Sequence, residues 1–222
     1  MQPYPGPGPY APPAYPGSGP MPGSGMPAGQ PPAGLVESIT SISKVALAFI
    51  GIRLALPIIF RFVPIGRMLP VESASVIMNG VKGLAALLAI IFYLVWFSRI
   101  YTFIRATRGE TRYSNGMAVG GWFIPFANFV MPYLALRDAW RRGANDENGF
   151  LVAIWWLCYL LAMVLEMFWS VVPQMLAGKI DIETSRTVFP ALGWLGLFAQ
   201  LGAWGLLGFF VQNLTARAPA SR

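Results

Sequence analysis

Residues 83–104, GLAALLAIIFYLVWFSRIYTFI, decide the class of fold. This stretch contains a single charged residue, Arg99, and no proline. An α-helix rises about 1.5 Å per residue, so about 20 consecutive apolar residues cross the roughly 30 Å hydrocarbon core of a bilayer. Residues 83–104 therefore predict a transmembrane helix.

Three further segments have the same character, at about 42–63, 150–172 and 190–214. The segment at 42–63 contains Pro57 near its end. The segment at 150–172 follows a polar turn at residues 145–149. Residues 64–81, which contain prolines and glycines, predict a loop with a short helix over 72–78. The expected fold is an all-α polytopic membrane protein with four transmembrane helices in a domain over residues 37–216.

The composition agrees with a lipid environment and argues against catalysis. Hydrophobic residues make up 55% and charged residues 11% of the chain, whereas a soluble domain is about 25% charged. The chain has no histidine and a single cysteine, Cys158. The usual general base, metal ligand and haem ligand are therefore missing, and no disulfide can form within the chain. We expect no enzyme activity, no cofactor and no metal site.

Residues 1–34 consist largely of Pro, Gly, Tyr, Ala and Ser, and no charged residue precedes Glu37. Such a segment buries too little apolar area to offset its ordering entropy. It also lacks the basic start and apolar centre of a signal peptide. We expect residues 1–36 to be a disordered cytoplasmic tail. Residues 1–34 either act as a plain linker or bind a cytoplasmic protein partner as a polyproline II ligand.

Arginines gather between the second and third spans, which predicts the orientation. By the positive-inside rule, this connection lies in the cytoplasm, and four spans then place both termini on the same side of a bacterial inner membrane. The net charge of +7 is explained by orientation and anionic lipid rather than by nucleic acid. Asp138 has a partner at helical spacing in Arg141 or Arg142. The arginines expected to contact lipid phosphates are Arg105, Arg108, Arg112, Arg141 and Arg142.

Residues 117–136 are apolar but are not expected to cross the membrane. A crossing would move Arg137, Arg141 and Arg142 outside, and Pro125 and Pro132 would interrupt its hydrogen bonding. Aromatic and apolar residues from Trp122 to Trp140 recur at helical spacing. The pattern favours a proline-broken element that lies in the interface or dips in and returns.

The sequence GGWFIPFANFVMPY at 120–133, followed by LRDAW at 136–140, resembles a bacterial membrane family filed as domain of unknown function 4328. The resemblance implies a multi-pass membrane protein and brings no activity, substrate or cofactor. Asn128 either satisfies the broken backbone beside the prolines or lines a small polar cavity. The signature element over 117–142 comprises Trp122, Pro125, Asn128, Pro132, Tyr133, Arg137 and Trp140.

Two ionisable residues, Arg53 and Glu166, fall deep within predicted spans. Measured from expected helix starts near Ser38 and Phe150, their depths agree within about one turn. We expect the two side chains to pair, because an unpaired charge in the membrane is costly. The pair either locks the first span to the third or marks an ion path.

Other residues have simpler expectations. Trp155, Trp156 and Trp169 are expected at the level of the lipid headgroups. Gln200 lies on a small-residue face that suits helix packing. Arg61 and Arg99 are expected to reach the two interfaces.

The function favoured by the sequence is that of a non-catalytic membrane scaffold, or a component that binds a protein partner or lipid. The alternative is a small transporter or channel subunit. Four helices enclose little pathway in one protomer, so that alternative requires a homo-oligomer.

Overall fold

The computed structural model describes residues 31–62, 71–144, 149–175 and 182–218. These ranges contain helices and no strands. The helices are α1 (Leu35–Phe62), α2 (Val71–Arg108), α3 (Asn115–Gly120), α4 (Met131–Ala144), α5 (Phe150–Met175) and α6 (Ile182–Arg217), with a 3₁₀ turn, η2 (Ala127–Phe129). By length and composition, α1, α2, α5 and α6 are able to cross a membrane. The chain is a multi-pass helical protein, as expected.

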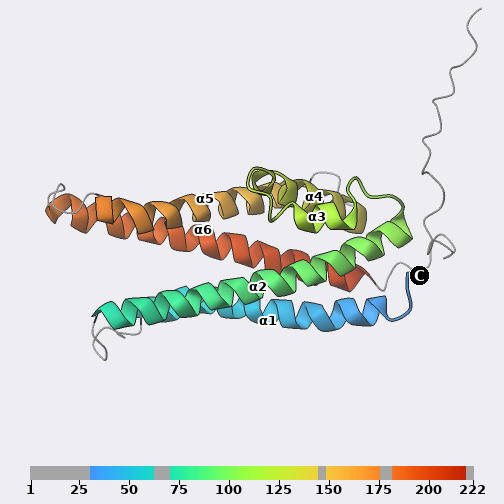
Figure 1. The fold of residues 1–222 in the computed structure, drawn as a ribbon, viewed down its shortest axis with the longest axis horizontal. Helices are drawn as coiled ribbons and strands as arrows, with labels where there is room; N and C mark the ends of the chain where they lie inside the picture. Colours follow the sequence, from blue (N-terminus) through green and yellow to red (C-terminus); the bar gives the residue numbers. More distant parts are fainter. Residues whose placement is uncertain (1–30, 63–70, 145–148, 176–181, 219–222) are drawn as a thin grey trace, which may run out of the picture.

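The long helices form two hairpins. Helix α1 packs against α2, α5 packs against α6, and contact between α1 and α6 joins the pairs. Figure 1 shows the two hairpins diverging away from the end where α3 and α4 lie. Helix α2 ends, and α5 begins, at that same end (Figure 1). The segment between them therefore returns to the side from which it started, as an interfacial or re-entrant element does.

The helices are longer than the expected spans. A loop with a short helix over 72–78 was expected before the second span, but α2 is continuous from Val71 through Asn79 and Gly80. Helix α1 begins at Leu35, before the expected start at about residue 42, and runs through Pro57. A proline removes one backbone donor, and a helix of this length keeps its other hydrogen bonds. The rest of the expected loop, residues 63–70, and the tail over 1–30 lie outside the described residues.

Aromatic side chains fill the interior where α2 meets α5 and the signature element. Trp155 and Trp156 are only 1% and 7% exposed. Their rings pack against each other and against Tyr159 on the next turn. Protein rather than lipid therefore surrounds both indoles, and their expected depth at the level of the headgroups stays a prediction. The side chain of Trp169 lies outside the described residues.

Helices α5 and α6 approach closely at Gly202. A Cβ atom added there would lie 3.0 Å from Cys158 Sγ. Cys158 is a free thiol, and it packs against this glycine of the partner helix. Small residues permit such close approach of helices in membranes.

Candidate functional site

The signature element is built around its two prolines. Ser114 caps α3 by accepting a hydrogen bond from the Met117 backbone N–H at 3.2 Å. Pro125 is exposed in the turn that follows, and Pro132 is buried in the first turn of α4. In a first turn the missing N–H of proline has no intrahelical partner to lose. The prolines therefore separate α3 from α4 without breaking either helix.

The signature element has one face buried against the long helices and another face that is exposed. Ala135, Leu136, Ala139 and Trp140 recur at helical spacing and are buried against α2, α5 and α6. The turn before α4 instead projects large apolar side chains outward, with Phe126 88% exposed. A contiguous exposed apolar patch on such an element suits insertion into lipid. The other exposed members of this apolar wedge are Phe123, Ile124, Phe129 and Val130.

Asp138 fixes α4 to the rest of the bundle. Its Oδ2 accepts hydrogen bonds from the Tyr101 hydroxyl at 3.1 Å and from the Arg112 backbone N–H at 3.0 Å. Its Oδ1 accepts one from Arg142 Nε at 2.9 Å. Of the two arginines that the sequence offered to Asp138, the structure places Arg142 against it. The carboxylate thereby joins α2, the connection after it and α4.

The remaining arginines near α4 fall into two groups. Arg108 donates to the Arg142 carbonyl at 2.7 Å, and Arg217 donates to the Ala144 carbonyl. These cations sit where a helix C-terminus leaves carbonyls unpaired. The second group is exposed around the same end of the molecule and consists of Arg105, Arg112 and Arg141. We call this second group the basic rim.

Three polar atoms of the signature residues are buried without a hydrogen-bond partner in the described part of the chain. They are Trp122 Nε1, Asn128 Oδ1 and Arg137 Nε. Arg137 also stacks over the Tyr133 ring at 5.8 Å. The side-chain oxygen of Asn128 therefore accepts no hydrogen bond in the described residues, and satisfaction of the freed carbonyls by its amide nitrogen stays a prediction.

A second polar group lies within the membrane-spanning part. Arg53 Nη2 and Glu166 Oε1 are 3.3 Å apart, so the structure brings together the two residues that matched in depth. The Arg53 side chain is 7% exposed and that of Glu166 56% exposed. Gln200 Nε2 also donates to Glu166 Oε1. The pair thus connects α1 to α5, and the amide adds α6.

Lys82 of α2 completes this group. Its ammonium lies 5.5 Å from the centre of the Phe60 ring, two helical turns beyond Arg53 on α1. Phe60 shares a face of α1 with Arg53, so Lys82 contacts the face of α1 that carries Arg53. We call Arg53, Lys82, Glu166 and Gln200 the intramembrane cluster.

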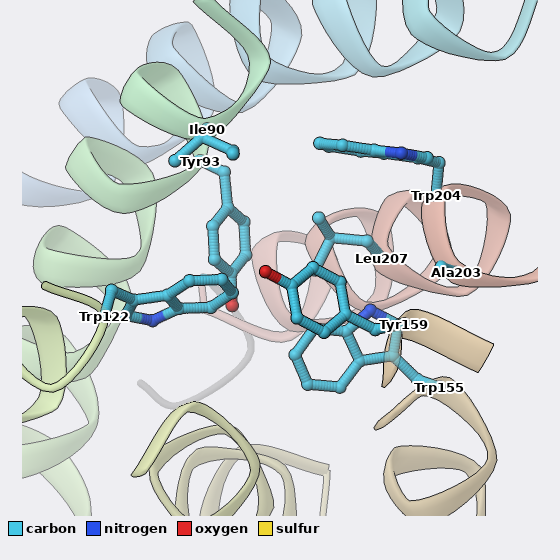
Figure 2. A pocket seen from close by; sticks show the side chains of 8 residues that line it. All are labelled: Ile90, Tyr93, Trp122, Trp155, Tyr159, Ala203, Trp204 and Leu207. Atoms are coloured by element: carbon cyan, nitrogen blue, oxygen red, sulfur yellow. The ribbon is translucent and has the colours of Figure 1, made fainter. Parts of the chain in front are cut away.

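An aromatic pocket is lined by side chains from α2, α5 and α6 together with Trp122 (Figure 2). Its free volume is about 20 Å³ for the centre of a water molecule, room for about one water. The Tyr93 hydroxyl is buried beside it without a partner among the described residues. The Arg53 guanidinium stacks over the Trp204 ring at 5.8 Å. Trp204 therefore contacts the cluster and also lines the pocket. The pocket is lined by Ile90, Tyr93, Trp122, Trp155, Tyr159, Ala203, Trp204 and Leu207.

Sequence reasoning missed several of these contacts. No contact of Lys82, Tyr101 or Arg217 was expected from the sequence. Helical spacing could have placed Lys82 and Tyr93 on one face of α2, since they are separated by about three turns.

The family model for DUF4328, a domain of unknown function, matches residues 71–201, which is more than half of the chain. The chain belongs to the DUF4328 family. The matched region begins at the first residue of α2 and ends in α6. It includes the whole signature element together with Lys82, Glu166 and Gln200, whereas Arg53 precedes it. No curated protein and no solved structure matches this DUF4328 chain.

Proposed function

We propose that this DUF4328 protein is a non-catalytic component of the bacterial inner membrane that holds anionic lipids at its cytoplasmic face. In this proposal both termini are cytoplasmic, and residues 1–34 recruit a protein partner there. The supporting observation is that the apolar wedge and the basic rim lie at the same end of the molecule. An amphipathic surface of this kind inserts apolar side chains below the headgroups while cations meet the phosphates.

The charges around the signature element support this proposal. Asp138 is already engaged by Arg142, Tyr101 and the backbone at 112. The guanidinium groups of Arg105 and Arg141 are exposed and have no acidic partner in the described residues. A juxtamembrane cation contributes about 1 kcal/mol to binding an anionic leaflet.

Replacing the basic rim tests the proposal. The triple variant Arg105→Gln, Arg112→Gln, Arg141→Gln removes three cations, so retention of phosphatidylglycerol on the purified protein should fall by at least tenfold. Native mass spectrometry in an uncharged detergent measures that retention. The matched control places lysine at the same positions and should retain the lipid. Equal retention by the glutamine and lysine variants would refute a phosphate-binding rim.

A test of the tail is independent of the rim. Deletion of residues 1–30 should abolish capture of a cytoplasmic protein by affinity purification from cells and leave membrane insertion unchanged. If capture survives the deletion, partner recruitment through the tail is wrong.

The second candidate is a small transporter or channel subunit acting as an oligomer. It is favoured by the intramembrane cluster, because ionisable groups within a membrane commonly mark ion or substrate paths. Glu166→Gln separates the candidates in reconstituted vesicles. Selective loss of ion flux with intact folding would support transport. Loss of folded protein that is rescued by Arg53→Glu with Glu166→Arg would support a structural lock.

A further inference from the structure

The intramembrane cluster carries more positive than negative charge. Arg53 and Lys82 are cationic, Glu166 is anionic and Gln200 is neutral, which leaves one formal positive charge inside a membrane span. A guanidinium does not lose its proton in proteins, so Arg53 keeps its charge, and an anion nearby also favours the charged form of Lys82. An uncompensated charge at this depth costs several kcal/mol. The cluster therefore favours an additional anion.

Arg53 has hydrogen-bonding capacity to offer such an anion. Its Nε and Nη1 atoms are buried and have no hydrogen-bond partner among the described residues. Only Nη2 meets Glu166, at 3.3 Å. Buried donors of a charged group are normally satisfied, so the two unpaired nitrogens indicate a missing acceptor. Arginine binds phosphate and carboxylate groups well because its donors form a planar fork.

The surroundings of the cluster indicate what carries the anion. Trp204 stacks under Arg53. Trp204 also lines the aromatic pocket (Figure 2), so the charged and apolar parts adjoin. An occupant that reaches both regions needs an anionic head and a hydrocarbon chain.

The architecture permits such an occupant to enter from the bilayer. Contact between α1 and α6 joins the hairpins, which diverge at the end away from α4 (Figure 1). The 56% exposure of Glu166 shows that the cluster is open on one side. The pocket itself has room for about one water, so binding a hydrocarbon chain requires the aromatic walls to move apart.

We propose that the intramembrane cluster and the aromatic pocket together bind one anionic amphiphile per protomer, with its phosphate or carboxylate at Arg53 and Lys82 and its chain against the aromatic walls. Glu166 competes with the ligand for Arg53. This site is separate from the basic rim of the proposed function.

The test is lipid binding to the delipidated full-length protein in an uncharged detergent, followed by native mass spectrometry. Phosphatidylglycerol and oleate supply the two anionic heads, phosphatidylcholine has the chains without net charge, and inorganic phosphate has no chain. We expect one saturable site for either anionic amphiphile and affinity about tenfold weaker for phosphatidylcholine. Inorganic phosphate should not bind at the same concentrations. Equal binding of phosphatidylcholine, or equally tight binding of phosphate, would overturn the proposal.

Two variants should change the affinity for phosphatidylglycerol in opposite directions. Lys82→Gln should weaken binding of phosphatidylglycerol about tenfold, since a charged hydrogen bond is lost. Glu166→Gln should instead strengthen it, because the competing carboxylate is gone. Lys44→Gln is the matched control, because Lys44 is an exposed lysine of α1 outside the cluster. The basic-rim variant should leave this saturable site intact, which separates failure here from failure of the proposed function.

Unchanged affinity in Lys82→Gln would overturn the site even if Glu166→Gln does not fold. If the wild type is a dimer that Glu166→Gln dissociates without altering lipid affinity, a second copy covers the cluster instead and the proposal is wrong.

Discussion

Asp138 is the residue on which the position of the signature element most depends. Three donors from three parts of the chain converge on its two oxygens, namely Tyr101, the Arg112 backbone and Arg142. Hydrogen bonds to an ionised acceptor are stronger than those between neutral groups. The side chain therefore holds the connection after α2 and the helix α4 in one arrangement.

Asp138→Asn should loosen this end of the molecule. The amide supplies one accepting oxygen in place of two, so a loss of about 1.5–3 kcal/mol in local stability is expected. Hydrogen exchange measured by mass spectrometry should rise over residues 109–114. Glu110→Gln is the control, since Glu110 is an exposed acid of the same connection. Equal protection in Asp138→Asn and wild type would contradict the role given to Asp138.

A second prediction at the scale of residues concerns Gly121, which lies where the polypeptide turns after α3. A Cβ added at Gly121 would lie 2.5 Å from the Cβ of Met131, which cannot move without the start of α4. Gly121→Ala should therefore lower stability by about 1–3 kcal/mol. Gly120→Ala, with nothing within 4 Å of the added atom, should not. Thermal unfolding followed by fluorescence-detected size exclusion distinguishes them, and a matching loss in both variants would refute this close packing.

At the scale of elements, the packing of α5 on α6 is set by small residues facing larger ones. A Cβ on Gly202 would lie 3.0 Å from Cys158 Sγ but 3.5 Å from Cys158 Cβ. Removing the sulfur therefore makes room for the added methyl group, and the two substitutions should be coupled.

Gly202→Ala should lower the midpoint of thermal unfolding, and the double variant with Cys158→Ala should recover most of the loss. The expected coupling is about 0.5–3 kcal/mol. Gly205→Ala serves as the control, because its added atom meets nothing within 4 Å. Strictly additive effects of Gly202→Ala and Cys158→Ala would show that the helices separate at this point.

Sequence reasoning predicted the elements better than their ends. Four apolar runs gave four long helices because a span of this length has few alternatives in lipid. The start of α2 was missed because Asn79 and Gly80 weaken helix propensity, and tertiary packing overrides that weak preference. The burial of Trp155 and Trp156 was not predicted, because a tryptophan near a helix end suits either a lipid interface or a protein interior. Only the position of α4 decides between these environments.

The candidate site was predictable in part for a related reason. Equal depth brought Arg53 and Glu166 together, since depth along parallel or antiparallel spans is read directly from the sequence. The positions of Lys82 and Trp204 near Arg53 could not be predicted in this way. Which side of a helix faces its neighbours depends on contacts between helices, which the sequence does not give. The resemblance over 120–140 is explained by the family match, but a family without known activity assigns no role to these residues.

At the scale of the whole molecule, the four long helices and the returning α3–α4 segment place the basic rim at one end of the bundle. The hairpins are joined through α1 and α6, and the Arg53–Glu166 ion pair adds a polar contact between them. The proposed lipid-binding face has a function only if this end meets the cytoplasmic leaflet, where anionic headgroups attract arginine. The side of the membrane on which α3 lies is therefore decisive.

The most direct measurement is labelling of single cysteines in intact cells with a membrane-impermeant maleimide, in a Cys158→Ala background. Cysteines replace Ser73 at the start of α2, Ser114 at the start of α3 and Ala216 at the end of α6, all exposed positions. We predict that Ser73→Cys reacts from outside, whereas Ser114→Cys and Ala216→Cys react only after the cells are permeabilised. External labelling of Ser114→Cys would place the basic rim on the wrong side of the membrane and contradict the proposed function.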